Sequence, residues 1–342
     1  MLPNKGGIVR AESLPDAKTA CKYEPGDILL SNIRPYFCKI WFADREGSCS
    51  NDVLVIKTKD GWLPKFIYYV LSDQNFFNYD SVTSKGTKMP RGTKNAIMKY
   101  FVPDIDKAEQ QKIVDVLSKY DSLIEANKKR IKNLQDQAAE LYKEWFVRFR
   151  FPGWETAVFE KGLPKSWKIK RVSDIGDVKA GGDCPKVYSD FRTEYTPVPI
   201  YSNGLDNRGL YGYTDKPKII KDSVTVSARG TIGYVCLREE PYVPIVRLVS
   251  VIPTSKDYPA RFVYYLLSNM HIEGFGTSQQ QLTVPFFKKR KILLPEPSVV
   301  KHFIDFANPI IDEQKHLERL ISLAEKQRDN LLQKLLCGKV SC

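Results

Sequence analysis

The 342-residue sequence predicts an α+β protein with two mixed globular domains, separated by two long helices that pack antiparallel as a coiled coil. Two stretches have apolar residues every three or four positions, segments of the first half recur in the second, and a proline- and glycine-rich linker joins the halves. Together these predict a tandem duplication with pseudo-two-fold symmetry. The expected boundaries are 1–105 and 167–297 for the globular domains, 106–147 and 298–338 for the helices, and 148–166 for the linker.

The first long helix is predicted from a stretch that contains neither glycine nor proline, Glu109 to Phe146. Its apolar residues recur every three or four positions, which is the pattern of a helix that buries one face. A helix of this length would be about 60 Å long. The second stretch, 298–338, repeats the pattern, but Pro309 lies near its start and predicts a kink there or a late start of the helix.

The globular domains also repeat. KFIYYVLSD at Lys65–Asp73 recurs as RFVYYLLSN at Arg261–Asn269, 196 positions later, and both read as core helices. GDILLSNIRPYFCKIWF at 26–42 and KDSVTVSARGTIGYVCL at 221–237 share an alternating pattern, which predicts two strands around a turn. Between the halves, Pro152 and other helix breakers mark the linker.

The composition favours a folded protein with a polyanionic partner. The hydrophobic fraction is 42%, and the formal net charge is +13. The two helical stretches carry no net charge, so all of the excess positive charge lies outside them. Two antiparallel helices would hold two basic domains a fixed distance apart, and DNA is the polyanion along whose axis half-sites repeat. The predicted partner is therefore double-stranded DNA.

Several classes of protein are disfavoured by simple signals. No run of eighteen apolar residues predicts a membrane-spanning helix, and the N-terminus lacks the pattern of a signal peptide. The seven cysteines are scattered and never spaced C-x-x-C, which disfavours a disulfide framework or a zinc site. Reduced thiols and a cytoplasmic location are expected, with no membrane contact.

Four motifs carry a resemblance to a known family. PDIDKAEQQKI, LYKEWFVRFRFPG, GLPKSWKIKRVSDIG and SARGTIG occur in this order along the chain, and the chain resembles the specificity subunit of Type I restriction-modification systems. The resemblance implies that each globular part is a target recognition domain that reads one half of a split DNA site. It also implies that methyltransferase subunits bind along the helices and that restriction subunits join the full complex.

The resemblance further implies a non-catalytic subunit that binds no cofactor of its own. S-adenosylmethionine, ATP and Mg²⁺ would be used by the partner subunits, and adenine would be methylated. One departure stands out, because only 26 residues precede DILLSNIRPYF, whereas about 55 residues separate the linker from SVTVSARGTIG. The first recognition domain is therefore expected to lack its opening strands. The alternative function is a coiled-coil assembly protein that has lost DNA reading.

Several loop-like segments carry basic or hydrogen-bonding side chains that could contact DNA. Arginine can pair with guanine, glutamine with adenine, and lysine with phosphate, whereas an ordinary turn or a solvated loop is the alternative at each position. The candidates in the first domain are Asn32, Arg34, Tyr36, Lys85, Lys88, Arg91 and Lys94. Those in the second domain are Tyr201, Ser202, Asn203, Arg229, Gln279, Gln280, Gln281, Lys288, Lys289 and Arg290.

Catalytic and metal-binding motifs are not found in the sequence. It lacks an aspartate or asparagine followed by two prolines and an aromatic residue, which would hold a flipped adenine, and it lacks a phosphate-binding loop. Asp104, Asp106 and Glu109 are the nearest acidic cluster, but acidic residues at a helix start favour the helix dipole. A self-contained nuclease or methyltransferase is therefore the least favoured of the three hypotheses.

Overall fold

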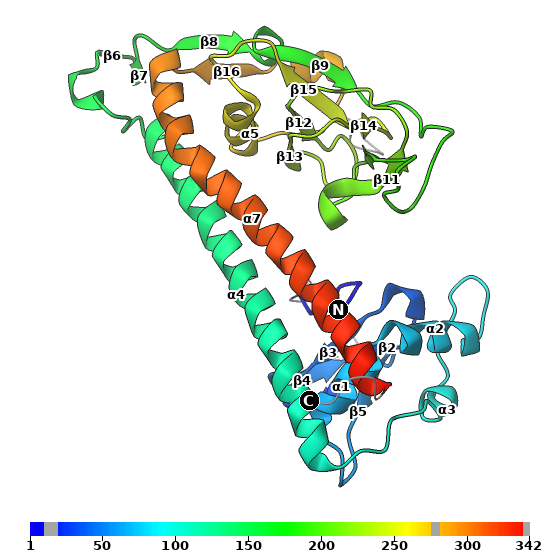
Figure 1. The fold of residues 1–342 in the computed structure, drawn as a ribbon. Coiled ribbons are helices and arrows are strands. Elements are labelled where there is room, and N and C mark those ends of the chain that lie inside the picture. The colour runs from blue at the N-terminus through cyan, green and yellow to red at the C-terminus, as the bar shows by residue number, and fades with distance from the viewer. Residues whose placement is uncertain (10–19, 275–280, 338–342) are drawn as a thin grey trace. The chain divides into compact units, whose positions relative to one another are not determined.

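A computed structural model describes residues 1–9, 20–274 and 281–337. The chain divides into two compact units, which we call unit 1 (Met1–Ile131 with His316–Cys342) and unit 2 (Lys132–Lys315). Helices α4 (Lys107–Phe146) and α7 (Pro297–Leu336) pass from one unit into the other (Figure 1). Each unit therefore contains one globular domain and one half of both helices. No described helix is long and apolar enough to cross a membrane.

Unit 1 is built on the antiparallel sheet β3-β2-β5. Its strands are β2 (Ile28–Ser31), β3 (Ile40–Phe42) and β5 (Val53–Ile56), and a separate ribbon pairs β1 (Cys21–Tyr23) with β4 (Gly47–Cys49). The helices are α1 (Pro64–Ser72), α2 (Gln74–Thr83) and α3 (Lys94–Ile97), and the short helix η1 spans Pro35–Phe37. Ile28, Leu30 and Ile40 of the sheet pack with Phe76 and Phe77 of α2 in the core.

A second core in unit 1 joins the globular domain to the long helices. Phe66 and Tyr69 of α1 pack with Leu117 near the start of α4 and with Leu332 and Leu335 near the end of α7. The apolar face of α1 is thereby buried, which removes its surface from water and stabilises the attachment. The YYVL segment is thus a core helix, as predicted.

Unit 2 contains a four-stranded sheet, β13-β12-β15-β9, and a three-stranded sheet, β11-β10-β14. The strands of the first are β9 (Gly176–Ala180), β12 (Ser223–Val226), β13 (Val235–Arg238) and β15 (Val249–Pro253). Those of the second are β10 (Val198–Tyr201), β11 (Leu210–Thr214) and β14 (Val243–Pro244). Two ribbons pair β8 (Lys168–Arg171) with β16 (Lys291–Leu294) and β6 (Phe159–Glu160) with β7 (Leu163–Pro164). The helices are α5 (Ala260–Ser268), α6 (Val284–Lys288), η2 (Trp154–Thr156), η3 (Val172–Asp174) and η4 (Asp206–Gly209).

In unit 2 the end of α4 packs against the start of α7. Tyr142 and Phe146 of α4 contact Phe303 of α7 and Phe262 of α5, with ring centroids 5.1 to 6.4 Å apart. Unit 1 shows the reverse pairing, the start of α4 with the end of α7, so the two helices are antiparallel. The predicted linker does break the helix, but Phe151 within it is buried in this same core.

The duplication is confirmed in three dimensions. Strand orders β3-β2-β5 and β13-β12-β15 match, and β2 and β12 begin 195 positions apart, at Ile28 and Ser223. The long helices begin 190 positions apart, at Lys107 and Pro297. In the described part of unit 1, neither β9 nor the β11-β10-β14 sheet has a counterpart.

Of the two expectations at Pro309, a kink or a late start of the helix, the late start is wrong, and the kink stays a prediction. Pro309 lies inside the helix, which begins at Pro297 and not after the proline. The sequence suggested a late start because proline lacks an N–H and disfavours the turn before it. The packing of Phe303 and Ala307 in the core of unit 2 holds that turn in the helix.

Candidate nucleic-acid interface

Three stretches singled out in the second domain converge around one loop of unit 2, the turn from β12 to β13. The N–H of Ala228 donates to Oδ1 of Asn203 at 2.8 Å, and the carbonyl of Ala228 accepts from the N–H of Leu282 at 2.9 Å. The adjacent Arg229 donates from Nε and Nη2 to Oε1 of Gln281, at 3.1 and 2.8 Å. These side-chain hydrogen bonds bring together residues that lie 25 and 52 positions apart in the sequence.

The loop that carries Arg229 is held at its base. The N–H of Ser227 donates to the carbonyl of Tyr234 at 2.9 Å, and the N–H of Gly233 donates to the carbonyl of Ser227 at 3.0 Å. Gly230 and Gly233 adopt φ of 68° and 84°, a region that glycine enters without steric cost. The backbone therefore presents Arg229, which is exposed, from a fixed position.

Asn203 holds this loop, and Tyr201 is buried at the end of β10. Tyr201 is buried, its hydroxyl donates to Glu240, and the guanidinium of Arg238 lies 3.6 Å from its ring centroid. Burial raises the pKa of Tyr201 to about 12. Both ends of the Asn203 amide are engaged, because Nδ2 donates to the carbonyl of Val246 while Oδ1 accepts from Ala228. The structure thus gives both side chains partners within the protein, and their direct contact with DNA stays a prediction.

Among the remaining candidates of the second domain, Lys288, Lys289 and Arg290 lie at the end of α6, and Ser202 follows β10. Lys288 is the last residue of α6 and Lys289 follows it, and both are exposed. Arg290 is half-buried and donates from Nη2 to the carbonyl of His271 at 2.7 Å. Ser202 is half-buried, and its N–H donates to the carbonyl of Gly209. Gln279 and Gln280 lie outside the described residues.

Unit 1 brings its candidates together at the corresponding place, the turn after β2 and the segment before α3. The N–H of Arg34 donates to the carbonyl of Pro90 at 2.8 Å, and the N–H of Gly92 donates to the carbonyl of Asn32 at 3.0 Å. Lys85 and Arg91 exchange two backbone hydrogen bonds of 2.9 Å. The two basic segments predicted separately thus form one surface.

Charge on this surface of unit 1 is only partly balanced. The guanidinium of Arg91 pairs with the carboxylate of Asp52, whose carbonyl also accepts the N–H of Asn32 at 2.8 Å. Lys85 and Lys88 are exposed in the loop. Lys94 is exposed too, but it begins α3 and does not lie in the loop that the sequence predicted. The ring of Tyr36 is 52% exposed beside Phe37.

Several enclosed polar atoms surround the same loop of unit 1. Within the described part of the chain, Asn32 Oδ1, Arg34 Nε and both carboxylate oxygens of Asp80 lack a hydrogen-bond partner. Asp80 lies under Gly92, where an added Cβ would meet its Oδ1 at 2.3 Å. Burial raises the pKa of Asp80 to about 6. Unpaired buried groups of this kind are rare in folded proteins, and nothing in the sequence marked Asp80.

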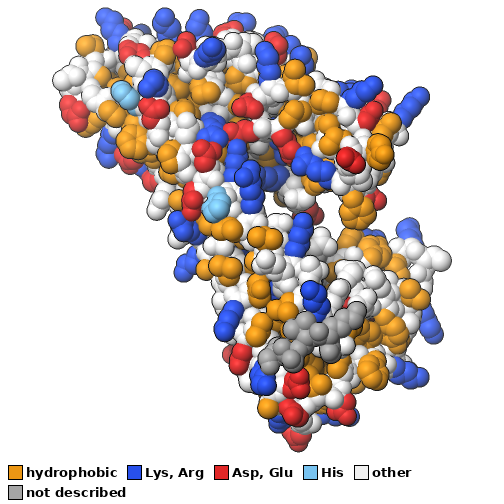
Figure 2. Space-filling model, viewed as in Figure 1, with side chains coloured by type: hydrophobic (Ala, Val, Ile, Leu, Met, Phe, Trp, Pro, Cys, Tyr) orange, Lys and Arg blue, Asp and Glu red, His pale blue; other side chains and the backbone are white. Residues whose placement is uncertain are grey.

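Basic side chains are distributed in small groups on the face seen in Figure 2, mixed with acidic and apolar ones. The net charge of +13 is therefore not gathered into one basic field on this face. Recognition of a polyanion on this face would then depend on single side chains, such as those in the turns after β2 and β12. Long-range attraction alone carries no sequence information.

The acidic cluster at the start of α4 has a structural role. The N–H of Glu109 donates to Oδ1 of Asp106 at 2.8 Å, which makes Asp106 the cap of the helix. Among residues 1–9, 20–274 and 281–337, no group of three or more His, Cys, Asp or Glu is placed to hold a metal ion.

Most of the chain matches a known protein family. Residues 8–136 and 164–329 match the family model described as Type I restriction modification DNA specificity domain. The chain is 26% identical over 306 residues to the Type I restriction enzyme MjaIX specificity subunit of Methanocaldococcus jannaschii, across 82% of this chain and 70% of that protein. It is 23% identical to the HindI specificity subunit of Haemophilus influenzae, across 97% and 90%.

A solved structure supports the fold. The S subunit of a Type I restriction-modification system from M. genitalium superposes with a TM-score of 0.54 at 18% identity, over 96% of this chain and 87% of that chain. The family match covers both repeats found above, including the β2–β3 and β12–β13 hairpins that carry the candidate loops. The chain belongs to the Type I restriction-modification DNA specificity family, and its function is DNA recognition without catalysis of its own.

Proposed function

We propose that each globular unit reads one half of a bipartite DNA site through the loop pair described above. The observation that carries this proposal is the equivalence of the two surfaces. In both repeats, the turn after the central strand meets the segment before a short helix, and arginine occupies the same place, Arg34 in unit 1 and Arg229 in unit 2. Repetition of one surface in two domains suits a site with two halves.

The proposal extends to partners along the long helices. Methyltransferase subunits bind α4 and α7, and restriction subunits join them in the full complex. Exposed apolar side chains on these helices favour this role, among them Leu123 and Phe306, 49% and 60% exposed. S-adenosylmethionine, ATP and Mg²⁺ are used by the partner subunits, and this chain binds none of them. The complex works in the cytoplasm, where the DNA is.

A methylome experiment tests the proposal directly. The chain is expressed with its cognate methyltransferase subunit in a host that lacks such a system, and methyladenine is mapped by sequencing. We expect a split motif with a fixed gap, whose two halves differ because the candidate loops of the two units differ in sequence. A motif with only one specified half would mean that one of the two units does not read DNA.

Salt dependence separates DNA reading from the alternative, an assembly protein that no longer contacts DNA. Phosphate contacts release counterions, so specific binding weakens steeply as salt rises. Absence of both a methylation motif and a salt-dependent affinity for duplex DNA would favour the assembly role.

A second test addresses the gap. We propose that the length of α4 and α7 sets the number of base pairs between the half-sites. Deleting seven residues from α4, with a matched deletion in α7, preserves the heptad seam and should change the gap. An unchanged gap in the methylome would contradict this part of the proposal.

A further inference from the structure

We propose that Arg229 reads a guanine within the half-site of unit 2, and that Gln281 is the positioning residue that aims it. This inference rests on the proposed function. It assigns a base contact to one side chain, where the proposed function assigns DNA reading only to a surface. Arg229 and Gln281 are hydrogen-bonded to each other, whereas the equivalent residues of unit 1 are not.

The geometry leaves the outer edge of the guanidinium available. Arginine has five N–H donors in a rigid fork, and Arg229 directs Nε and one N–H of Nη2 to Oε1 of Gln281. The two N–H groups of Nη1 and the second of Nη2 are left. A fork from Nη1 and Nη2 matches O6 and N7 of guanine in the major groove, the commonest base-specific contact of arginine.

The partner that fixes Arg229 is neutral, and this distinguishes Arg229 from Arg192 and Arg261 of the same unit. Arg192 pairs with the carboxylate of Glu240 at 2.6 Å, and Arg261 pairs with Glu239 at 2.7 Å. In the described part of the chain no carboxylate pairs with Arg229. An amide oxygen fixes the orientation of the guanidinium without neutralising its positive charge. The side chain can therefore still be attracted to the negative charge of DNA.

A fixed fork matters more for a base than for a phosphate. A phosphate contact needs positive charge and tolerates a flexible lysine, as at the exposed Lys288 and Lys289. Bidentate pairing with a base needs a set direction, and pre-ordering the side chain reduces the entropy lost on binding. The loop base at Ser227 and Gly233 fixes the backbone, and Gln281 fixes the side chain.

Unit 1 has the same arginine without the same support. Arg34 lies 195 positions before Arg229, and the place of Gln281 is taken by Arg91, 190 positions earlier. Arg91 cannot accept a hydrogen bond from Arg34, and its guanidinium pairs with Asp52 instead. The Arg34 guanidinium lies 5.9 Å from the ring centroid of Phe37, and its Nε is unpaired among the described residues. We therefore infer a sharper guanine preference in unit 2 than in unit 1.

The test uses the full chain in complex with its methyltransferase subunit and duplexes that carry the motif found in the methylome. Each guanine in turn is replaced by 7-deazaguanine, which lacks the N7 acceptor but still pairs with cytosine. We expect one guanine in one half-site whose replacement weakens binding by about 5- to 150-fold. With Arg229→Ala, the same replacement should have no further effect.

Variants of the pair separate base reading from simple charge. Arg229→Lys keeps the charge, so a phosphate contact would survive it, whereas we expect loss of the 7-deazaguanine effect. Gln281→Ala should reduce that effect with little change in salt dependence. Gln281→Glu should weaken binding further, because a carboxylate would neutralise Arg229. Arg192→Ala is the matched control, an arginine of the same unit already paired with Glu240, and should retain the full effect.

The outcomes are distinguishable from failure of the proposed function. If Arg229→Ala and Arg229→Lys bind every duplex as the wild type does, or if no guanine is sensitive to replacement, the inference is wrong while DNA recognition stands. If wild-type complex binds no duplex specifically, the proposed function itself fails.

Discussion

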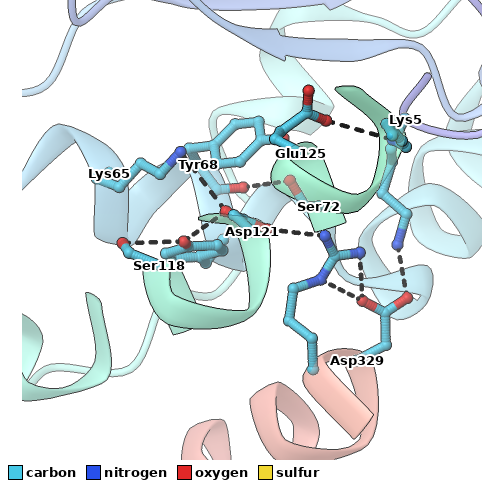
Figure 3. A network of polar contacts seen from close by, with 11 residues as sticks. Lys5, Lys65, Tyr68, Ser72, Ser118, Asp121, Glu125 and Asp329 are labelled. Carbon is cyan, nitrogen blue, oxygen red and sulfur yellow. Dashed lines mark hydrogen bonds and ion pairs between the residues drawn. The ribbon is translucent and has the colours of Figure 1, made fainter. Parts of the chain in front are cut away.

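The guanidinium of Arg328, near the end of α7, donates from Nη1 to the carboxylate of Asp121 on α4 at 2.8 Å (Figure 3). The same carboxylate accepts from the hydroxyl of Tyr69 on α1 at 2.6 Å and lies 3.7 Å from the ammonium of Lys65. Burial lowers the pKa of Lys65, and Asp121 opposes that effect. One carboxylate thus joins three helices of unit 1.

Replacement of Arg328 tests how much this junction contributes. The side chains of Arg328 and Asp121 are 19% and 24% exposed, so Arg328→Ala leaves a mostly enclosed carboxylate short of its main partner. We expect unit 1 to lose about 2–3 kcal/mol, measured by hydrogen exchange of α1 amides because a two-unit chain need not unfold in one step. Lys128→Ala, which removes an exposed pair with Glu125, should change stability by less than about 0.5 kcal/mol.

Gln110 offers a second stability test. It is buried, accepts from the N–H of Leu63 at 2.8 Å, and donates to the carbonyls of Gly61 and Ile105 at 3.1 and 2.9 Å. Gln110→Val should destabilise unit 1 by about 2–4 kcal/mol, because three backbone groups lose the buried side chain that pairs with them. The exposed neighbour Gln111 is the control, and an equal loss for Gln111→Val would contradict this account.

The pKa of Asp80 gives a pH dependence with a definite sign. Its pKa rises from 3.8 to about 6 on folding, so the unfolded chain releases this proton at lower pH than the folded chain does. Stability of unit 1 therefore falls as pH rises from about 4 to 6, and the penalty is complete above that. Asp80→Asn should stabilise unit 1 at pH 8 on the order of 1–2 kcal/mol and have no effect at pH 4. The stability of unit 1 is measured at both pH values by hydrogen exchange of α2 amides, corrected for the intrinsic exchange rate at each pH, and an equal gain at both would rule out the titration of Asp80 as its cause.

Lys288 and Lys289 are predicted to contact phosphate. Changing both to alanine should weaken binding to specific and random duplexes alike and lower the slope of log affinity against log salt by about 2. The exposed Lys256 serves as a control, since it lies outside the candidate loops. An unchanged slope for the double variant would exclude phosphate contact at this place.

Periodicity and repetition were enough to predict the long helices and the duplication. The seam of α4 is long and uninterrupted, and KFIYYVLSD and RFVYYLLSN bury the same face of α1 and α5. Pro309 misled the prediction of where α7 starts, because local backbone chemistry favours a helix start after proline, while the core contacts of α7 are made with residues distant in sequence.

The candidate site was predictable only in part. Polar residues in loops pointed to Asn203, Arg229 and Gln281, but only the structure shows that Asn203 holds the loop while Arg229 is exposed. Tyr201 looked accessible because it precedes a turn, yet it is the last residue of a buried strand. Asp52 and Asp80 carried no signal, since an acidic side chain is not expected beside a candidate DNA-binding loop.

Helix α7 has a consequence for how the protein is made. It supplies Leu332 and Leu335 to the core of unit 1, together with Arg328, although the rest of that unit lies in residues 1–131. Unit 2 is one continuous stretch of chain and can fold as soon as residue 315 has left the ribosome. Unit 1 begins before unit 2 in the chain but is completed after it. During synthesis the apolar face of α1 has only the start of α4 as a long-helix partner until Leu332 and Leu335 of α7 emerge.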